Sequence, residues 1–192
     1  DAFFVAFRIP NTFRRLFSEG TFNAAFVPSY SSLLNKKKLS ENFANNIFNL
    51  LILGLLLLII IIEILMPFFV LLIAPGFEGD SQKIELAITL TRITFPFLLF
   101  ISLASFFSAI LNAHNKFAIA SAAPIILNIL LIGVLIFGKI LNDQLVYYLS
   151  YAVTISGILQ FIFLYFFINK YFSPKLKINI KIDQKIKTFF KK

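Results

Sequence analysis

Long apolar stretches without a single charge are the feature that most constrains how this chain folds. Residues 47–62, 118–138 and 145–168 contain no acidic or basic side chain. A helix of about 20 residues, rising 1.5 Å per residue, crosses the roughly 30 Å hydrocarbon core of a bilayer. Only 14% of the 192 residues are charged and 59% are hydrophobic, which is far from the composition of a soluble domain. The sequence therefore predicts an all-α, polytopic helical membrane protein.

Five transmembrane spans are predicted. Their approximate bounds are 1–34, 43–73, 84–112, 118–138 and 145–172. The first span is expected to be kinked and interrupted at Pro10, Gly20 and Pro28, because proline lacks the backbone donor that a helix needs. The chain opens at Asp1 without a methionine or a basic leader, so we expect it to be a fragment of a longer protein.

The lysines predict how the spans are oriented. Twelve of them fall on one side of the predicted topology, namely Lys36, Lys37, Lys38, Lys116, Lys170, Lys175, Lys177, Lys181, Lys185, Lys187, Lys191 and Lys192. Only Lys83 and Lys139 fall on the other side. The positive-inside rule then places loops 35–42 and 113–117 and the tail 173–192 of this multi-pass protein in the cytoplasm. The tail is predicted to be a basic connector, or an extended segment lying on anionic headgroups.

The arginines are placed differently, because all of them fall within predicted spans. They are Arg8, Arg14, Arg15 and Arg92. An arginine near the middle of a span costs about 2.5–3.5 kcal/mol, so the first span is expected to turn its arginines toward water or protein. Six polar side chains of this span share an arc of about 100° on an ideal helix. They are Asp1, Arg8, Asn11, Arg15, Ser18 and Glu19, with Arg14 just beyond the edge.

This polar stripe predicts a binding surface for an anionic substrate. A guanidinium stays ionised when it is partly desolvated, and its fork of donors matches phosphate oxygens in pairs. Asp1 and Glu19 are expected to hold the arginines while the site is empty. The candidate site residues are therefore Asp1, Arg8, Asn11, Arg14, Arg15, Glu19 and Arg92.

Simpler interpretations stay open for several of these residues. Arg14 and Arg15 could reach headgroups at the membrane rim, and Arg92 could do the same at the outer face. Glu63 is expected to face a cavity or to pair with a neighbour. Two amides within the spans, Asn128 and Gln160, are expected to make interhelical hydrogen bonds.

Other chemistry is excluded by residue type. The chain has no cysteine and a single histidine, so disulfides, thiolate metal sites and multi-histidine clusters are excluded, and we expect no cofactor or metal. The histidine, His114, is expected to be only a loop residue.

The stretch DAFFVAFRIPNTFRRLFSEG at residues 1–20, followed by Phe22 and AFVP at 25–28, resembles the MurJ (MviN) family of bacterial lipid II flippases. Shorter matches follow in order, namely APGF at 74–77, RITFP at 92–96, ISLAS at 101–105, AILN at 109–112, NKF at 115–117, and Ala123, Pro124 and Asn128. The resemblance implies a larger two-lobed transporter bundle, the fourteen-helix fold of the multidrug and lipid-oligosaccharide exporter superfamily, of which this chain would hold the second to sixth helices. It also implies that Asp1, Asn11, Arg14 and Glu19 occupy cavity-lining positions, with Arg15 at a basic one.

The implied activity is movement of undecaprenyl-diphosphate-linked peptidoglycan precursor across the bacterial cytoplasmic (inner) membrane by alternating access. The alternatives are a multidrug or polysaccharide-precursor exporter of the same superfamily, an intramembrane enzyme acting on lipid diphosphates, and a structural subunit. No membrane-embedded acid pair supports catalysis, so we expect a transporter and not an enzyme. The expected partners are lipid II, membrane lipids and further helices of the same polypeptide, but no nucleic acid; a coupling ion stays open.

Overall fold

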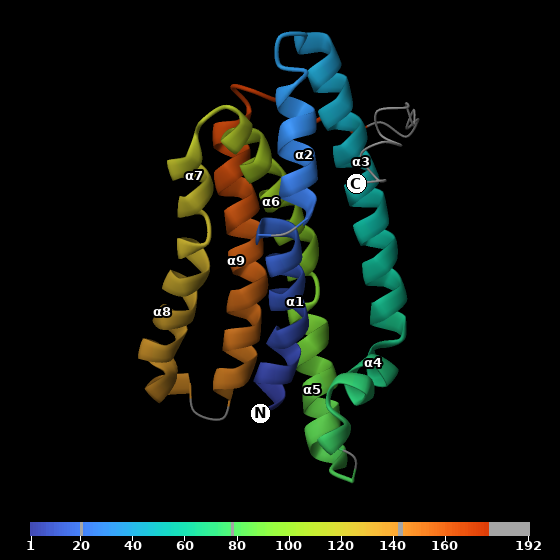
Figure 1. Ribbon diagram of the computed structural model, residues 1–192. Coiled ribbons are helices and arrows are strands. Elements are labelled where there is room, and N and C mark those ends of the chain that lie inside the picture. Colours follow the sequence, from blue (N-terminus) through green and yellow to red (C-terminus); the bar gives the residue numbers. More distant parts are fainter. Residues whose placement is uncertain (20, 78, 142–143, 177–192) are drawn as a thin grey trace.

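The computed structural model describes residues 1–19, 21–77, 79–141 and 144–176, and its regular elements over this part of the chain are all helices (Figure 1). The expected all-α membrane fold is confirmed. In chain order the helices are α1 (Ala2–Glu19), α2 (Thr21–Ser31), α3 (Lys37–Ile64), α4 (Met66–Ile73), the short 3₁₀ helix η1 (Pro75–Phe77), α5 (Ser81–Thr94), α6 (Phe97–Ala113), α7 (Phe117–Ala122), α8 (Ile125–Leu141) and α9 (Leu145–Ile168).

Four helical stretches in the described residues are long and apolar enough to cross a membrane. They are Lys37–Ile64, Ser81–Ala113, Phe117–Gly138 and Leu145–Ile168. The pair formed by α1 and α2 is not among these four, and it contains three of the four arginines of the chain. Apolar side chains on α3 and α8 are widely exposed, as expected for surfaces that face lipid or further protein; they include Leu53, Leu57, Ile60, Ile64, Ile129, Ile132 and Ile136.

Two of the predicted interruptions of the first segment are wrong, because α1 continues through Pro10 and α2 through Pro28. A proline leaves the carbonyl four residues earlier without its usual donor. For Pro10 that carbonyl belongs to Ala6, and it accepts a hydrogen bond from the hydroxyl of Thr94 on α5 at 2.9 Å. The neighbouring helix therefore satisfies the freed group, as membrane helices require.

Other boundaries also differ from the expected ones. Helix α3 begins at Lys37, so most of the predicted loop 35–42 is helical. The fourth predicted span is divided at Pro124 into α7 and α8. The third is divided into α5 and α6 just before Phe97, and the hydroxyl of Thr154 on α9 donates to the carbonyl of Ile93 beside this break.

Helix α6 lies at the centre of the bundle, where it packs against α1, α2, α3, α7 and α9. Its end near Ala113 is surrounded by buried aromatic rings from several helices, including Phe26, Tyr30, Phe43, Phe48, Phe106, Phe107 and Phe172. Stacked and edge-to-face ring pairs of this kind add stability beyond the area they bury. This aromatic core fixes α2 and α3 against α6.

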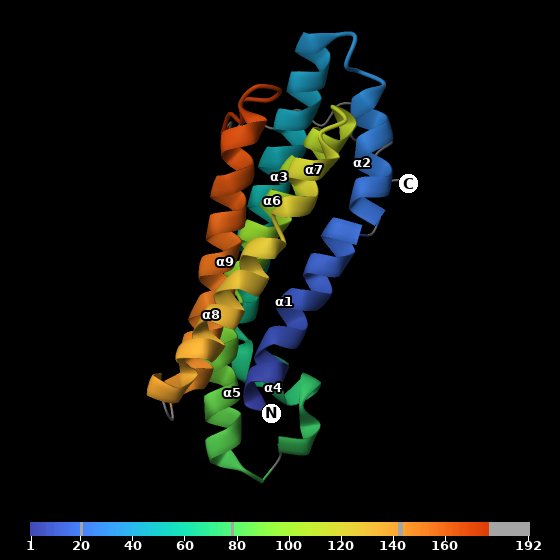
Figure 2. The same ribbon diagram turned by 90° about the vertical axis from the view of Figure 1, so that its left-hand side faces the viewer.

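The connections between helices collect at two opposite ends of the bundle (Figures 1 and 2). The α2–α3 and α6–α7 connections and the end of α9 lie together, and they carry Lys36, Lys116 and Lys170. The short helix η1 and the first turns of α5 and α9 lie at the other end. Beyond α9 the chain is tied to α3, since Asn45 Oδ1 accepts from the backbone N–H of Lys175 at 2.7 Å and Asn49 Nδ2 donates to its carbonyl at 2.9 Å.

Candidate functional site

The polar stripe of α1 lies opposite the face by which this helix packs. Ala2 and Ala6 are buried against α5 and α6, at 8% and 0% exposure. On the opposite side of the helix, Arg8 and Arg15 are exposed and Asn11 is half-buried. Asp1 is exposed on the same side. The structure thus presents two guanidinium groups on a surface of the bundle, with small alanine side chains letting the other side of α1 pack closely.

The described residues do not cover the whole predicted stripe. The side chains of Arg14, Ser18 and Glu19 lie outside them, although the backbone of all three belongs to α1. Their roles stay predictions that rest on helical spacing and on the resemblance. The large ring of Phe4, 73% exposed, shares the surface with the arginines.

Arg92 is directed toward another helix. Its Nε lies 3.9 Å from Oε2 of Glu63 on α3, which agrees with the interpretation of Glu63 as the partner of a neighbour. The side chain of Arg92 is 51% exposed and that of Glu63 29%, so the pair is loose and partly open. Arg92 therefore pairs with α3 and is not part of the polar stripe of α1.

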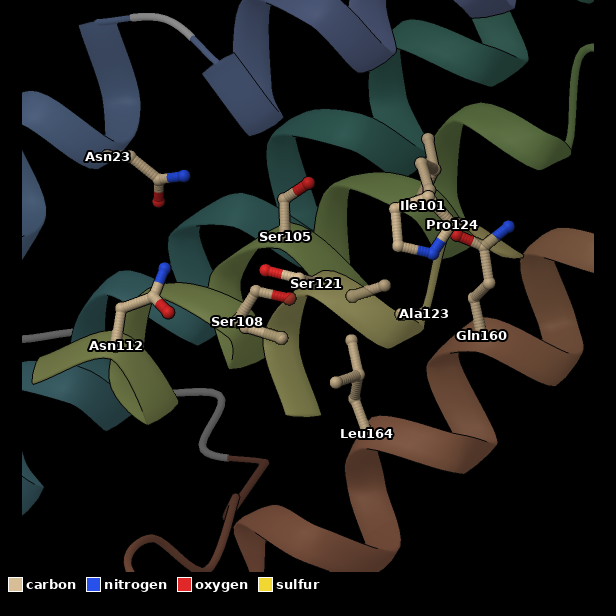
Figure 3. Close-up of a pocket in the computed structure, with 12 residues that line it drawn as sticks. Asn23, Ile101, Ser105, Ser108, Asn112, Ser121, Ala123, Pro124, Gln160 and Leu164 are labelled. Carbon is tan, nitrogen blue, oxygen red and sulfur yellow. The ribbon is translucent and has the colours of Figure 1, made fainter. Parts of the chain in front are cut away.

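A pocket of about 340 Å³ opens between α2, α6, α7 and α9. The residues that line it are Asn23, Ile101, Ala104, Ser105, Ser108, Asn112, Ala120, Ser121, Ala123, Pro124, Gln160 and Leu164. Figure 3 shows three hydroxyls and three amides distributed along it, contributed by all four helices. The pocket-lining residues that the structure describes are all uncharged. The pocket, defined by these residues, is called the amide–hydroxyl pocket below.

Burial changes from one wall of this pocket to the other. Gln160 and Ser105 are buried, at 1% and 5% exposure, whereas Ser121 is exposed and Ser108 and Asn112 are half-buried. Nε2 of Gln160 and Oδ1 of Asn112 are buried atoms without a hydrogen-bond partner. Such a group costs about 1–3 kcal/mol when it is left unsatisfied. A donor and an acceptor are therefore available to a guest.

The hydrogen bond expected of Gln160 is thus not made by its Nε2. Sequence reasoning also missed the wall of the pocket that α6 forms. Ser105, Ser108 and Asn112 recur at intervals of three and four residues, which places them on one face of α6. That spacing is the signal that could have identified the pocket.

His114 is more than a loop residue, because it caps α6 and contacts two other segments. Its Nε2 lies 3.4 Å from the hydroxyl of Tyr30 on α2, and its ring centroid lies 4.6 Å from that of Tyr171. Burial lowers the pKa of His114 below its ordinary value, since the charged form loses solvation there.

Among the described residues, no group of three or more histidine, cysteine, aspartate or glutamate side chains is close enough to hold an ion. The described surface presents three exposed guanidinium groups, those of Arg8, Arg15 and Arg92, and an uncharged polar pocket.

Comparison with known proteins gives a consistent result. The family described as "Lipid II flippase MurJ" matches residues 1–192. A probable lipid II flippase MurJ of Rickettsia prowazekii is 40% identical over 172 residues, which is 88% of this chain and 34% of that protein. The lipid II flippase MurJ of Burkholderia cenocepacia is 37% identical over 164 residues, or 84% of this chain and 32% of that protein. The chain thus spans about a third of the length of these curated relatives.

A solved structure is also similar over the whole chain. It is "Lipid II flippase MurJ, inward closed conformation", with a TM-score of 0.76 and 30% sequence identity. The similarity covers 100% of this chain and 40% of that one.

Proposed function

The chain belongs to the lipid II flippase MurJ family, and from that membership we propose that it forms part of a flippase for lipid II. The substrate would be the undecaprenyl-diphosphate-linked peptidoglycan precursor, moved across the bacterial cytoplasmic membrane by alternating access. Because the chain spans about a third of its curated relatives, further helices of the same polypeptide would complete the cavity. We infer transport and not catalysis from the family description.

The exposed guanidiniums of Arg8 and Arg15 carry this proposal. They lie on a helix whose other face is buried in an apolar bundle, and the cost of arginine in hydrocarbon argues against a lipid-facing position. A surface that faces a water-filled cavity removes that cost. In such a cavity the two cations would bind the diphosphate, which presents several oxygens for charge-assisted hydrogen bonds.

The position of the exposed lysines supports an orientation. The connections that carry Lys36 and Lys116 lie at one end of the bundle together with the end of α9. We propose that this end is cytoplasmic, since short loops rich in lysine stay on that side of the membrane. The short helix η1 and the first turns of α5 and α9 would then face the outside. A coupling ion or the membrane potential would bias the cycle.

The test of this function is growth rescue. Bacteria depleted of their own lipid II flippase would receive the full-length gene that encodes this chain, or an Arg8→Glu, Arg15→Glu double variant. We expect the unchanged gene to restore growth and the charge-reversed variant to fail while still accumulating in the membrane. Failure of the unchanged gene, despite normal membrane levels, would count against the proposed function.

A further inference from the structure

The amide–hydroxyl pocket offers binding chemistry that complements the arginines of α1. The described residues that line it present hydroxyls at Ser105, Ser108 and Ser121, and amides that both donate and accept. With no charged side chain among these residues, the pocket is matched to an uncharged polar guest. A ligand that carries hydroxyl and amide groups at close spacing uses both kinds of partner.

Two buried atoms indicate that the pocket is built to accept a guest. Gln160 Nε2 can only donate, and Asn112 Oδ1 can only accept, and both are left without a partner. Figure 3 shows Asn112 and Gln160 toward opposite ends of the pocket, with the serines between them. A single ligand must therefore present an acceptor and a donor some distance apart, as a sugar ring with an acetamido substituent does.

The size and position of the pocket favour the sugar nearest the diphosphate. Its volume of about 340 Å³ is at the lower end of small-molecule sites, which suits one sugar with some bound water. Asn23 follows Arg15 by eight residues, a separation of roughly 12 Å or less along a helix axis. A diphosphate held by the arginines would place an attached sugar within reach of α2.

The peptide part of the headgroup is a poorer guest. It carries carboxylates, and a carboxylate buried without a cation or several donors is strongly disfavoured. We propose that the amide–hydroxyl pocket binds an N-acetylated sugar of the lipid-linked substrate, with Gln160 and Asn112 as its hydrogen-bonding anchors; this inference rests on the proposed function. It makes the pocket the element that distinguishes a sugar-bearing lipid from the bare carrier lipid.

The experiment compares two ligands on one protein. The full-length protein in lipid nanodiscs would be titrated with lipid II and with undecaprenyl diphosphate, which has the same diphosphate and tail but no sugar. The variant is Gln160→Met, which keeps the side-chain volume and removes the amide. We expect its affinity for lipid II to fall about three- to tenfold, the range for one hydrogen bond, with the affinity for undecaprenyl diphosphate unchanged.

Two further variants sharpen the result. Asn112→Leu removes the other anchor and should produce the same selective loss. Asn128→Leu changes an exposed amide on α8 that does not line the pocket, so both affinities should stay at the original level. Thermal unfolding of each variant checks folding, and Gln160→Met should unfold at the same or a higher temperature, because it removes an unsatisfied buried donor.

Access to the pocket is measured separately. A cysteine at the exposed position Ser121, in an otherwise cysteine-free full-length protein, should react with a small thiol reagent and be protected by lipid II but not by undecaprenyl diphosphate. No reaction without ligand would mean that another helix covers the pocket, and this would overturn the inference. The inference would also be overturned if Gln160→Met lost affinity equally for lipid II and undecaprenyl diphosphate, or lost none. The pocket would then hold only water.

Failure of the proposed function gives a different pattern. In that case the unchanged protein would bind neither lipid, or the Arg8→Glu, Arg15→Glu variant would retain full affinity for undecaprenyl diphosphate.

Discussion

Gly157 on α9 lies so close to Phe97 on α6 that a Cβ at this position would be 2.7 Å from Cδ2 of the ring. The ring is fully buried, and the glycine lies in the most extensive helix–helix contact of the described residues, that of α6 with α9. Small residues let membrane helices approach in this way, because helix association in lipid depends on close packing. Phe97 begins α6 directly after the proline break, so the contact fixes where the two halves of this span meet.

Replacing that glycine should destabilise the bundle. Gly157→Ala forces the buried ring or the helix to shift, which typically costs about 1–3 kcal/mol, more than alanine gains by helix propensity. The measurement is the thermal unfolding of the purified full-length protein in detergent. Gly54→Ala on α3 is the control, because a Cβ there meets nothing within 4 Å. Equal stability of the two variants would show that the close approach has no energetic weight.

The hydroxyl of Thr94 should hold α1 in place. It donates to the Ala6 carbonyl that Pro10 leaves free, and Thr94→Val removes the donor while keeping the shape. We expect a loss of about 0.6–1.5 kcal/mol in unfolding free energy and slower transport, since α1 positions the arginines. Thr89→Val is the matched control, because the hydroxyl of Thr89 donates within its own helix, to the backbone carbonyl of Glu85. A Thr94 variant that behaves like the Thr89 variant would contradict this role.

The two arginines should act through charge. In proteoliposomes that hold the full-length protein, Arg15→Gln should lower lipid II translocation by about tenfold or more, the effect of losing a charge-assisted contact of about 1.5–3 kcal/mol. Lys83→Gln should have little effect, since this lysine pairs with Asp80 on the surface at the end of the bundle. Translocation at the original rate in Arg15→Gln would separate Arg15 from the substrate path.

His114 should make stability depend on pH. Because its pKa is lowered in the folded protein, the unfolded chain binds more protons just below pH 6.5, the ordinary value of the group. Its contribution to stability is therefore fully present above pH 6.5 and is lost as the pH falls through the folded pKa. The measurement is the melting temperature between pH 5 and 8, and His114→Gln should flatten the profile. An unchanged slope in that variant would assign the dependence to other groups.

The two asparagines of α3 should protect the chain beyond α9. They bond both backbone groups of Lys175, and Asn49→Leu removes the donor to its carbonyl. We expect trypsin to cut after Lys175 several times faster in this variant, because protease access follows local opening. In the control variant Asn128→Leu, on the exposed face of α8, trypsin should cut after Lys175 at the original rate. Protection that survives Asn49→Leu would mean that other contacts hold this segment.

The elements that sequence reasoning predicted well depend on residue type and on local spacing. The charge-free runs identified an all-α membrane protein, and the block of residues 1–20 identified the family. The helical spacing of Asp1, Arg8 and Arg15 predicts one side of α1 for them; all three are exposed, and their part in a binding site stays a prediction. These properties are local, since one helix turn or one bilayer crossing defines them.

The errors have a common cause. Pro10 does not interrupt α1, because Thr94, 84 residues later in the chain, supplies the missing donor. The Nε2 of Gln160 has no partner because the facing segments leave a pocket, and His114 is packed because it contacts Tyr30 and Tyr171. None of these partners is near in sequence.

By itself the sequence determined that this chain crosses membranes, to which family it belongs and which helices contain the arginines. The reason is that hydrophobic run length and helical periodicity are local properties of the sequence. Only the tertiary structure decided which carbonyls and amides are satisfied, where Gly157 lets two helices touch, and that four helices enclose a neutral polar pocket. Hydrogen bonding and close packing join groups that are distant along the chain, so their outcome depends on how the helices are arranged in space.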